Sequence, residues 1–269
     1  MDSRAFKSFE LAGWQRVAME YHDAFAALTT QAIEPLLDAA QVVEGTRLLD
    51  VATGPGYVAG AAAARRARVA AVDFSEPMLE LARRFWPDLE FRHGDAERLD
   101  LADRSFDAVV MNFGLLHLSA PDLALSEAHR VLRPGGRVGF TVWAPADEAV
   151  AFGIVLKAIE QQGNLSVPLP PGPPFFRFSA ANECRSSMER VGFREITVTR
   201  VPQSWVLGSV DALFTAMLGA TVRTGGLLRA QTAEARVRIR EAIVKAVEPY
   251  RTGDAVTLPM PAVLAAATA

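Results

Sequence analysis

The sequence has very little cysteine and no long apolar run, and both absences narrow the class of protein. Cys184 is the single cysteine in 269 residues, which excludes an internal disulfide framework and a cysteine-based zinc site. Apolar stretches such as Ala59–Ala64 are far shorter than the roughly 20 residues that span a bilayer. The opening MDSRAFKSFELAGW lacks the long apolar region of a signal peptide. We therefore expect a cytoplasmic protein with no membrane span.

The chain also lacks an excess of charge of either sign. Its 28 Lys and Arg residues face 31 Asp and Glu residues, for a net charge of −3. Phosphate binding needs a basic face, so this balance argues against a nucleic-acid partner. The four histidines form no H-E-x-x-H pattern, and we expect no metal site. With 50% apolar residues, the chain can bury one large core and an appended lobe.

What the sequence does contain is an alternation of short apolar strands and helices. Strands are expected at Arg47–Val51, Val69–Val72, Leu89–His93, Phe106–Asn112 and Arg137–Val142. Helices are expected between them, at Val58–Arg66, Pro77–Phe85 and Ala120–Leu132. This order predicts a parallel sheet with helices on both faces.

The flanking segments have a different character. Residues 14–40 are expected to be helical, because apolar side chains recur there every three or four residues. After Trp143, a proline-rich segment, PLPPGPPFFRF, excludes regular structure locally. Around it we expect helices at Glu148–Gln162, Ala181–Val191, Val210–Leu218 and Leu227–Ala246, a strand at Glu195–Val201, and a last edge strand in TLPMPAVLAAATA.

The most informative segment is the glycine-rich turn after the first strand, DVATGPGYVA at residues 50–59. Glycine lets the backbone approach a ligand closely, and the following helix offers unpaired N–H groups. Asp73, at the end of the second strand, can accept hydrogen bonds from ribose hydroxyls. Residues 54–59 also match the dinucleotide fingerprint G-x-G-x-x-A. A tight turn that binds no ligand would use glycine as well. The turn alone therefore leaves its ligand open.

Three later motifs add information. Asp95 and Ala96 follow the third strand in FRHGDAE, where a carboxylate can accept from an adenine amino group and a backbone N–H can face a ring nitrogen. The fourth strand ends in VMNFGLLH, and LRPGG precedes the fifth.

Together, D-x-A-x-G-x-G, the acidic end of strand two, G-D-A-E and L-R-P-G-G resemble the class I S-adenosylmethionine (SAM)-dependent methyltransferase family. The resemblance covers about residues 42–145. It is strongest to the branch of ubiquinone/menaquinone C-methyltransferases, whose F-G-L segment is matched at 113–115. The chain departs from the pattern at Ala52, where many members carry glycine, and after Trp143, where it does not resemble the quinone enzymes.

The resemblance implies a fold and a division of the chain. The fold would be α/β and Rossmann-like, doubly wound, with a mostly parallel seven-stranded sheet, helices on both faces and an added helical lid. Residues 1–41 would form a helical cap over the cofactor, and residues 42–145 the SAM-binding core. Residues 146–269 would supply substrate-side lid helices and the last sheet strands.

The implied activity is transfer of a methyl group from SAM to an O, N or C atom of a small apolar or aromatic metabolite, with S-adenosylhomocysteine as product. One alternative is a SAM-binding protein that does not methylate, either pericyclase-like or regulatory. The other is an NAD(P)-dependent dehydrogenase, which is disfavoured because none of the three tyrosines begins a Tyr-x-x-x-Lys motif. The expected partner is a small-molecule acceptor, and the expected state a monomer or homodimer.

Site residues follow from the same resemblance. An imidazole suits proton transfer near neutral pH, so His117 is the candidate base, although it can equally be a plain pocket wall. His22 is a weaker candidate, and His93 and His129 are expected to be structural.

Aromatic faces attract a sulfonium, but aromatic residues at helical spacing are more often core. For the acceptor we single out Trp14, Tyr21, Phe176 and Arg177. The expected cofactor contacts are Asp50, Ala52, Gly54, Gly56, Asp73, Phe74, Met78, Asp95, Ala96, Asn112 and Phe113.

Overall fold

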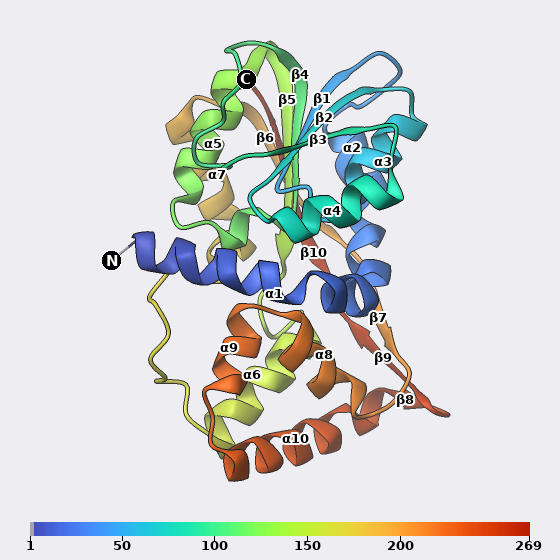
Figure 1. Cartoon of the computed structure of the whole chain (residues 1–269), viewed down its shortest axis with the longest axis vertical. Helices are drawn as coiled ribbons and strands as arrows, with labels where there is room; N and C mark the ends of the chain where they lie inside the picture. Colours follow the sequence, from blue (N-terminus) through green and yellow to red (C-terminus); the bar gives the residue numbers. More distant parts are fainter. Residues whose placement is uncertain (1–2) are drawn as a thin grey trace.

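The computed structural model describes residues 3–269, and a seven-stranded sheet forms its upper body in Figure 1. The strand order is β3–β2–β1–β4–β5–β10–β6. The strands of this sheet are β1 (Arg47–Val51), β2 (Arg68–Asp73), β3 (Glu90–His93), β4 (Phe106–Asn112), β5 (Leu132–Trp143), β6 (Arg194–Val201) and β10 (Ala262–Thr268).

Pairing in this sheet is mostly parallel. β1 pairs in parallel with β2 and β4, and the pairs β2–β3 and β4–β5 are parallel too. β10 runs antiparallel to both β5 and β6. Helices α5 (Pro121–Val131) and α7 (Ala181–Val191) lie on one face, and α2 (Ile33–Ala39) and α3 (Tyr57–Ala64) on the other (Figure 1). The expected doubly wound, Rossmann-like α/β fold is confirmed.

Burial of both faces of the sheet explains why the central strands consist of consecutive apolar residues. Leu48, Leu49 and Val51 of β1 are all buried, as are residues 108–111 of β4. A parallel strand covered by helices on both faces has no solvent side, so its apolar residues do not alternate with polar ones. The expected strand and helix positions between residues 47 and 131 match the structure to within two residues at each end, with α4 at Glu76–Phe85.

The amino-terminal helix is longer than the sequence pattern indicated. α1 spans Ser3–Thr29 and passes through a short 3-10 turn, Thr30–Ala32, into α2. Phe6 and Glu10 are buried and extend the three- and four-residue spacing backwards from Trp14. At Gly13, a Cβ atom would stand 2.3 Å from Val222, so only glycine permits this close approach.

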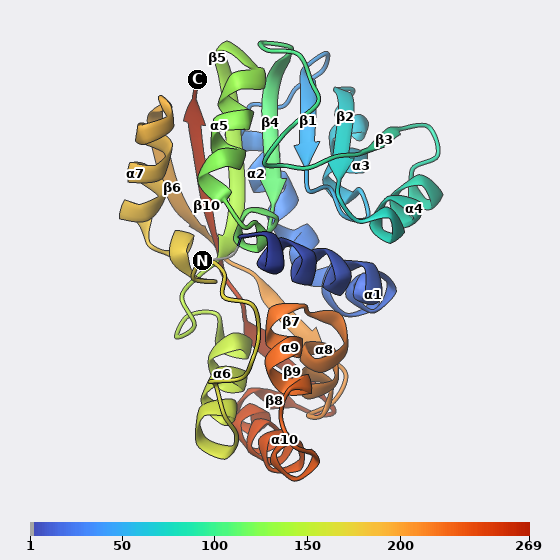
Figure 2. The same cartoon turned by 60° about the vertical axis from the view of Figure 1, so that its left-hand side comes forward.

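The other elements form a second body, the lower body, which lies below α1 in Figures 1 and 2. It contains helices α6 (Val150–Gln162), α8 (Ala212–Ala220), α9 (Arg223–Arg229) and α10 (Ala233–Val247) and a three-stranded sheet, β7–β9–β8. The strands are β7 (Ser204–Leu207), β8 (Arg251–Thr252) and β9 (Ala255–Pro259). This small antiparallel sheet was not expected, because its strands are short and two of them lie about fifty residues from the third along the chain.

Three expectations about the chain after residue 131 were wrong. The LRPGG segment belongs to β5, which begins at Leu132. The single helix expected at 227–246 is two helices, α9 and α10. The side chain of Thr232 accepts a hydrogen bond from the N–H of Ala235 and caps the beginning of α10. The last strand is not at an edge: β10 is inserted between β5 and β6, where its small, buried residues 262–267 fit between two neighbours.

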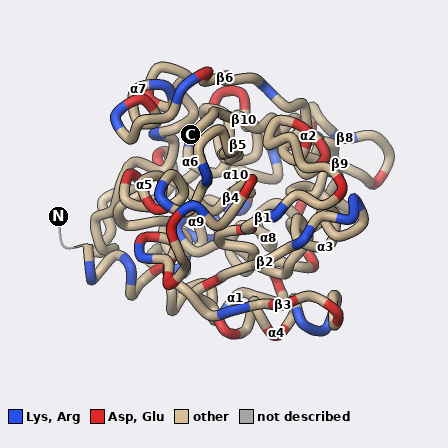
Figure 3. Tube along the Cα trace, turned by 90° about the horizontal axis from the view of Figure 1, so that it is seen from above, with Lys and Arg blue, Asp and Glu red and all other residues tan. Residues whose placement is uncertain are grey.

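Basic and acidic residues are interspersed along the trace seen from above (Figure 3). Within residues 3–269 no helix has both the length and the apolar character needed to cross a membrane. The same residues contain no group of three or more His, Cys, Asp or Glu side chains placed to hold a metal ion.

Helix α5 offers a matched test of the core. Leu125 is fully buried beneath the sheet, whereas Leu123 is 56% exposed on the same helix. We expect Leu125→Ala to lower the free energy of unfolding by about 2–5 kcal/mol, since it leaves a cavity. Leu123→Ala should change it by less than about 0.5 kcal/mol. Urea unfolding of the two variants at 25 °C checks this, and equal costs would contradict the burial assigned to Leu125.

Candidate cofactor and acceptor site

The main cavity lies where the strand order reverses. β1 and β4 are neighbours in the sheet, and their chain connections leave in opposite directions, toward β2 and toward β5. In doubly wound sheets the carboxyl ends of such strands leave a crevice that no crossover covers. Here the crevice is a cavity lined from β1, β2, β4 and the segments that follow them, and α1 lies across it.

Asp50, near the end of β1, is buried in the wall of this cavity. One carboxylate oxygen, Oδ2, accepts a 2.5 Å hydrogen bond from the hydroxyl of Thr53. The other, Oδ1, is buried and makes no hydrogen bond of ordinary geometry, while the backbone N–H of Ala59 lies near the carboxyl and opposes the rise of its pKa. Burial raises the pKa of Asp50 to about 7. A buried oxygen without a donor at the wall of a cavity marks a place where a ligand N–H can bind.

The two glycines of the turn have different roles. Gly54 has φ +54°, and a Cβ added there would meet no atom within 4 Å, so its backbone lies open to the cavity. Gly56, also at positive φ, is not part of the cavity wall: its Cβ position lies 2.8–2.9 Å from the rings of Phe91 and Trp86. Gly56 is therefore required by close packing under the turn, and its expected contact with the cofactor stays a prediction.

Two non-glycine residues at the strand ends also adopt positive φ. Ala52 has φ 55° after β1, and Phe113 has φ 54° after β4. A left-handed backbone costs an L-residue about 1–2 kcal/mol, which explains why glycine is common at the position of Ala52. Gly114 relieves crowding between the two turns, since a Cβ there would stand 2.6 Å from that of Ala52. Both of these strained residues line the cavity.

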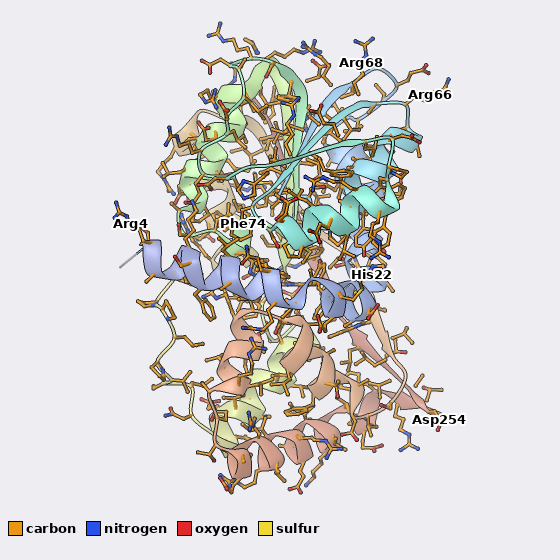
Figure 4. All side chains as sticks on the ribbon, in the orientation of Figure 1. Arg4, His22, Arg66, Arg68, Phe74 and Asp254 are labelled. Atoms are coloured by element: carbon orange, nitrogen blue, oxygen red, sulfur yellow. The ribbon has the colours of Figure 1, made fainter. Side chains whose placement is uncertain are left out.

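Asp73, at the end of β2, uses its carboxylate to join the backbone after β1 to the backbone after β2. Its Oδ2 accepts from the backbone N–H of Gly54 and its Oδ1 from that of Ser75, both at 2.8 Å. Burial raises the pKa of Asp73 to about 6. Phe74 and Met78 line the cavity beside it, and Figure 4 labels Phe74 just above α1.

Asp95 and Ala96 lie further along the same wall, and an unexpected partner covers them. Lys7 of α1 forms an ion pair with Asp95 and another, at 2.9 Å, with Glu97. Glu97 in turn accepts from the hydroxyl of Ser119 and the N–H of Ala120. These contacts hold the first turns of α1 over one end of the cavity.

Asn112 lines the cavity at the end of β4, with its amide already engaged. Its Nδ2 donates to the carbonyl of Thr29 at 3.1 Å, and its Oδ1 accepts from the hydroxyl of Thr141 at 2.6 Å. The side chain therefore ties the end of α1 to the sheet. Phe113, which follows it, stacks on Trp143 with ring centroids 4.1 Å apart.

A second, smaller cavity adjoins the first. Trp14, Tyr21, Phe113 and His117 line both cavities, so they form the boundary between them. Most of the remaining wall of the second cavity is aromatic or comes from the start of α9: Phe25, Trp143, Phe152, Phe175, Ala220, Thr221, Val222, Arg223 and Thr224.

Two of the expected acceptor residues are not in either cavity. Phe176 packs edge-on against Phe152 and Phe175, behind the cavity wall. Arg177 turns outward to ion pairs with Asp122 and Glu183, at 2.7 and 3.3 Å. Phe175, one residue earlier, faces the second cavity instead. Of the residues at the end of the proline-rich segment, it is thus Phe175 that lines a cavity.

His22 is not in either cavity. It bonds to the hydroxyl of Tyr57 and packs against the ring of Phe85 at 4.8 Å, near α4 in Figure 4. Of the four histidines, only His117 lines the cavities.

Sequence reasoning missed Glu10, a residue of the first cavity wall. Glu10 of α1 is buried, and its Oε2 accepts from Nε1 of Trp14 and bonds to Nδ1 of His117, both at 3.1 Å. Arg223 of α9 approaches its other oxygen to 4.0 Å. Glu10 precedes Trp14 by four residues, so helical spacing would have placed the two on one face.

Comparison with protein families gives an independent description of the core. Residues 49–140 match the family model described as a methyltransferase domain. This range contains the glycine-rich turn, Asp73, Asp95 and the end of β4 with His117.

Curated relatives match over a similar length. A demethylmenaquinone methyltransferase from Renibacterium salmoninarum is 45% identical over 103 residues, which is 38% of this chain and 44% of the relative. One from Clavibacter sepedonicus is 46% identical over 113 residues, or 41% of this chain and 43% of the relative. The chain thus spans less than half the length of these relatives.

Among solved structures, phosphoethanolamine N-methyltransferase 2 of Haemonchus contortus, in complex with phosphomonomethylethanolamine and S-adenosylhomocysteine, has a TM-score of 0.59. It is 19% identical and covers 98% of this chain and 60% of its own, so the likeness concerns the fold. Taken together, residues 49–140 match a methyltransferase domain, and the chain resembles the class I SAM-dependent methyltransferases, including the demethylmenaquinone branch.

Proposed function

We propose that the protein is a SAM-dependent methyltransferase acting on a small, planar aromatic acceptor. One observation carries the proposal: the cavity at the carboxyl ends of β1 and β4 meets a second, aromatic cavity at Phe113 and His117. Two adjoining sites with a shared boundary suit a reaction that passes one group between two ligands.

The residues of the first cavity fit SAM. Asp73 has the carboxylate that ribose hydroxyls need, and Phe74 and Met78 offer apolar contact to a ring. Asp50 has a buried oxygen without a donor, and the open backbone of Gly54 lies next to it. An amino-acid ammonium is a donor of the right charge for that oxygen. Asp95 and Ala96 remain the proposed adenine contacts.

When bound, the sulfonium of SAM supplies an already reactive methyl group. The chain then has to align the acceptor and exclude water. Trp14, Tyr21 and Phe113 stand at the boundary of the two cavities, where aromatic faces favour a nearby cation. α1 closes the cavity from outside, which limits the access of water.

The second cavity supports an aromatic acceptor. Phe152, Phe175 and Trp143 give it flat apolar walls, and edge-to-face or stacked contacts with such walls favour a planar ring. A quinol-type ring is one member of this class, and relatives are named for demethylmenaquinone. These three walls lie outside residues 49–140, so the segments that set acceptor choice are outside the matched domain.

The first test concerns Asp73. Asp73→Asn should weaken binding of S-adenosylhomocysteine by about tenfold or more, because hydrogen bonds to a charged group are worth about 1.5–3 kcal/mol. Isothermal titration calorimetry measures the change, with far-UV circular dichroism to confirm folding. Asp88→Asn, an exposed site, is the matched control and should bind like the parent. Parent-like affinity in Asp73→Asn would exclude the ribose role.

The second test concerns Asp50. Its pKa is raised to about 7, so part of it is protonated at pH 6.5, where an α-ammonium is fully charged. A bound ammonium favours the carboxylate, and binding should therefore release a proton. By linkage, affinity for S-adenosylhomocysteine rises with pH up to about 7 and then levels off.

Proton release is measured by titration calorimetry at pH 6.5 in two buffers of different ionisation enthalpy. The apparent binding enthalpy of the parent should differ between the buffers. In Asp50→Asn most of that difference should disappear, and in the Asp88→Asn control it should persist. An unchanged difference in Asp50→Asn would assign the proton to another group.

A further inference from the structure

We infer that Glu10 and His117 form a proton-accepting pair and that the acceptor carries an acidic hydroxyl group, such as a phenol or an enol. His117 would take the hydroxyl proton, and Glu10 would be the positioning residue. The inference rests on the proposed function and deepens it by naming the chemical class of the acceptor.

The pair is built across two distant parts of the chain. Glu10 comes from α1, and His117 from the 3-10 turn Leu115–His117 after β4. The side chain of Glu10 is 1% exposed, and that of His117 is 16% exposed. Because a carboxylate only accepts, the 3.1 Å contact assigns the hydrogen to Nδ1 of His117. The neutral ring then has its lone pair at Nε2.

The protein leaves Nε2 free. Over residues 3–269 the hydrogen bond to Glu10 is the one bond recorded for the His117 side chain. The ring packs edge-on against Trp14 at 4.7 Å and Phe175 at 5.9 Å, which restricts its rotation. Since His117 lines both cavities, its unprotonated nitrogen is available at the boundary where the methyl group would pass.

Charge balance around Glu10 favours an acidic acceptor over a cationic one. The second carboxylate oxygen, Oε1, has no hydrogen bond, which would suit an ammonium acceptor. However, the guanidinium of Arg223 lies 4.0 Å from that oxygen and offsets its charge. Arg223 also lies over the rings of Phe6 and Phe175, and it lines the second cavity. A cation already stands in this wall, and it favours a developing phenolate.

The proposed step balances. The acceptor O–H bond breaks, and its proton moves to Nε2 of His117, which becomes an imidazolium held by the Glu10 carboxylate. The freed electron pair on oxygen, or on the conjugated ring carbon, forms a bond to the methyl carbon of SAM. The carbon–sulfur bond breaks, and its electrons remain on sulfur as a neutral thioether.

The first experiment reads the tautomer of His117 directly. Long-range ¹H–¹⁵N correlation spectra are recorded on the protein saturated with S-adenosylhomocysteine, at a pH where the rings are neutral, with His117→Ala assigning the signal. The parent should carry its proton on Nδ1. Glu10→Leu should shift the proton to Nε2, and Glu10→Gln, which still offers an acceptor oxygen, should restore the parent form.

The matched control is Glu20→Leu, an exposed position on the same helix, which should leave the His117 signal unchanged. An Nε2–H tautomer in the parent would overturn the inference, and this reading is made on the parent protein itself, with His117→Ala used only to assign the signal. A parent-like tautomer in folded Glu10→Leu would overturn the role of Glu10.

The second experiment measures binding of ring-matched probes to the same complex. 2-Naphthol should bind at least about tenfold more tightly than naphthalene, and His117→Ala and Glu10→Leu should reduce this ratio to below about threefold. Glu20→Leu should keep it. The absence of a preference for the naphthol, or tighter binding of 2-naphthylmethylammonium, would overturn the assigned acceptor class.

Failure here can be told apart from failure of the proposed function. If S-adenosylhomocysteine does not bind the parent, the proposed function is wrong. A second outcome is that S-adenosylhomocysteine binds the parent and Glu10→Leu equally well, while the tautomer or the probe affinities differ from those expected. In that case only the Glu10–His117 pair is wrong.

Discussion

The strand reversal between β1 and β4 is the constraint on which the rest of the site depends. The chain connections from these two strands run to opposite sides, so the carboxyl ends stay uncovered by either crossover. Two buried carboxylates of the first cavity stand at or beside such ends: Asp50 near the end of β1 and Asp73 at the end of β2. Burial raises the pKa of both. The sheet places these groups, and the helices around it keep water away.

Helix α1 converts this open crevice into two cavities. Lys7 pairs with Asp95 and Glu97 at one end, Glu10 meets His117 in the middle, and Gly13 lets the lower body approach. The helix therefore contacts the sheet-containing body and the lower body at once, as Figure 2 shows. Helix α1 is therefore a wall that both bodies share. A change in the lower body reaches the boundary of the cavities through this helix, and it would thereby affect which acceptor the protein binds.

Buried polar groups at this boundary are few and mostly paired, as packing energetics demand. Asn112, Thr29 and Thr141 satisfy one another and join the end of α1 to the sheet. The exceptions are informative: Oδ1 of Asp50 and Oε1 of Glu10 lack partners, and both belong to residues of the cavity wall. Both unpaired oxygens thus belong to the wall of the first cavity, and Glu10 is joined to the boundary with the second cavity through its bond to His117.

The sequence by itself determined the core of the protein. Apolar runs, the glycine-rich turn and the acidic strand ends are local patterns, so β1 to β4 and the residues Asp50, Gly54, Asp73 and Asp95 could be placed from them. Only the tertiary structure decided the rest. Gly56 serves packing, Arg177 faces outward, β10 enters the middle of the sheet, and Glu10 meets His117 across 107 positions. Periodicity along one segment records which face is buried, but it carries no information about which distant segment covers that face.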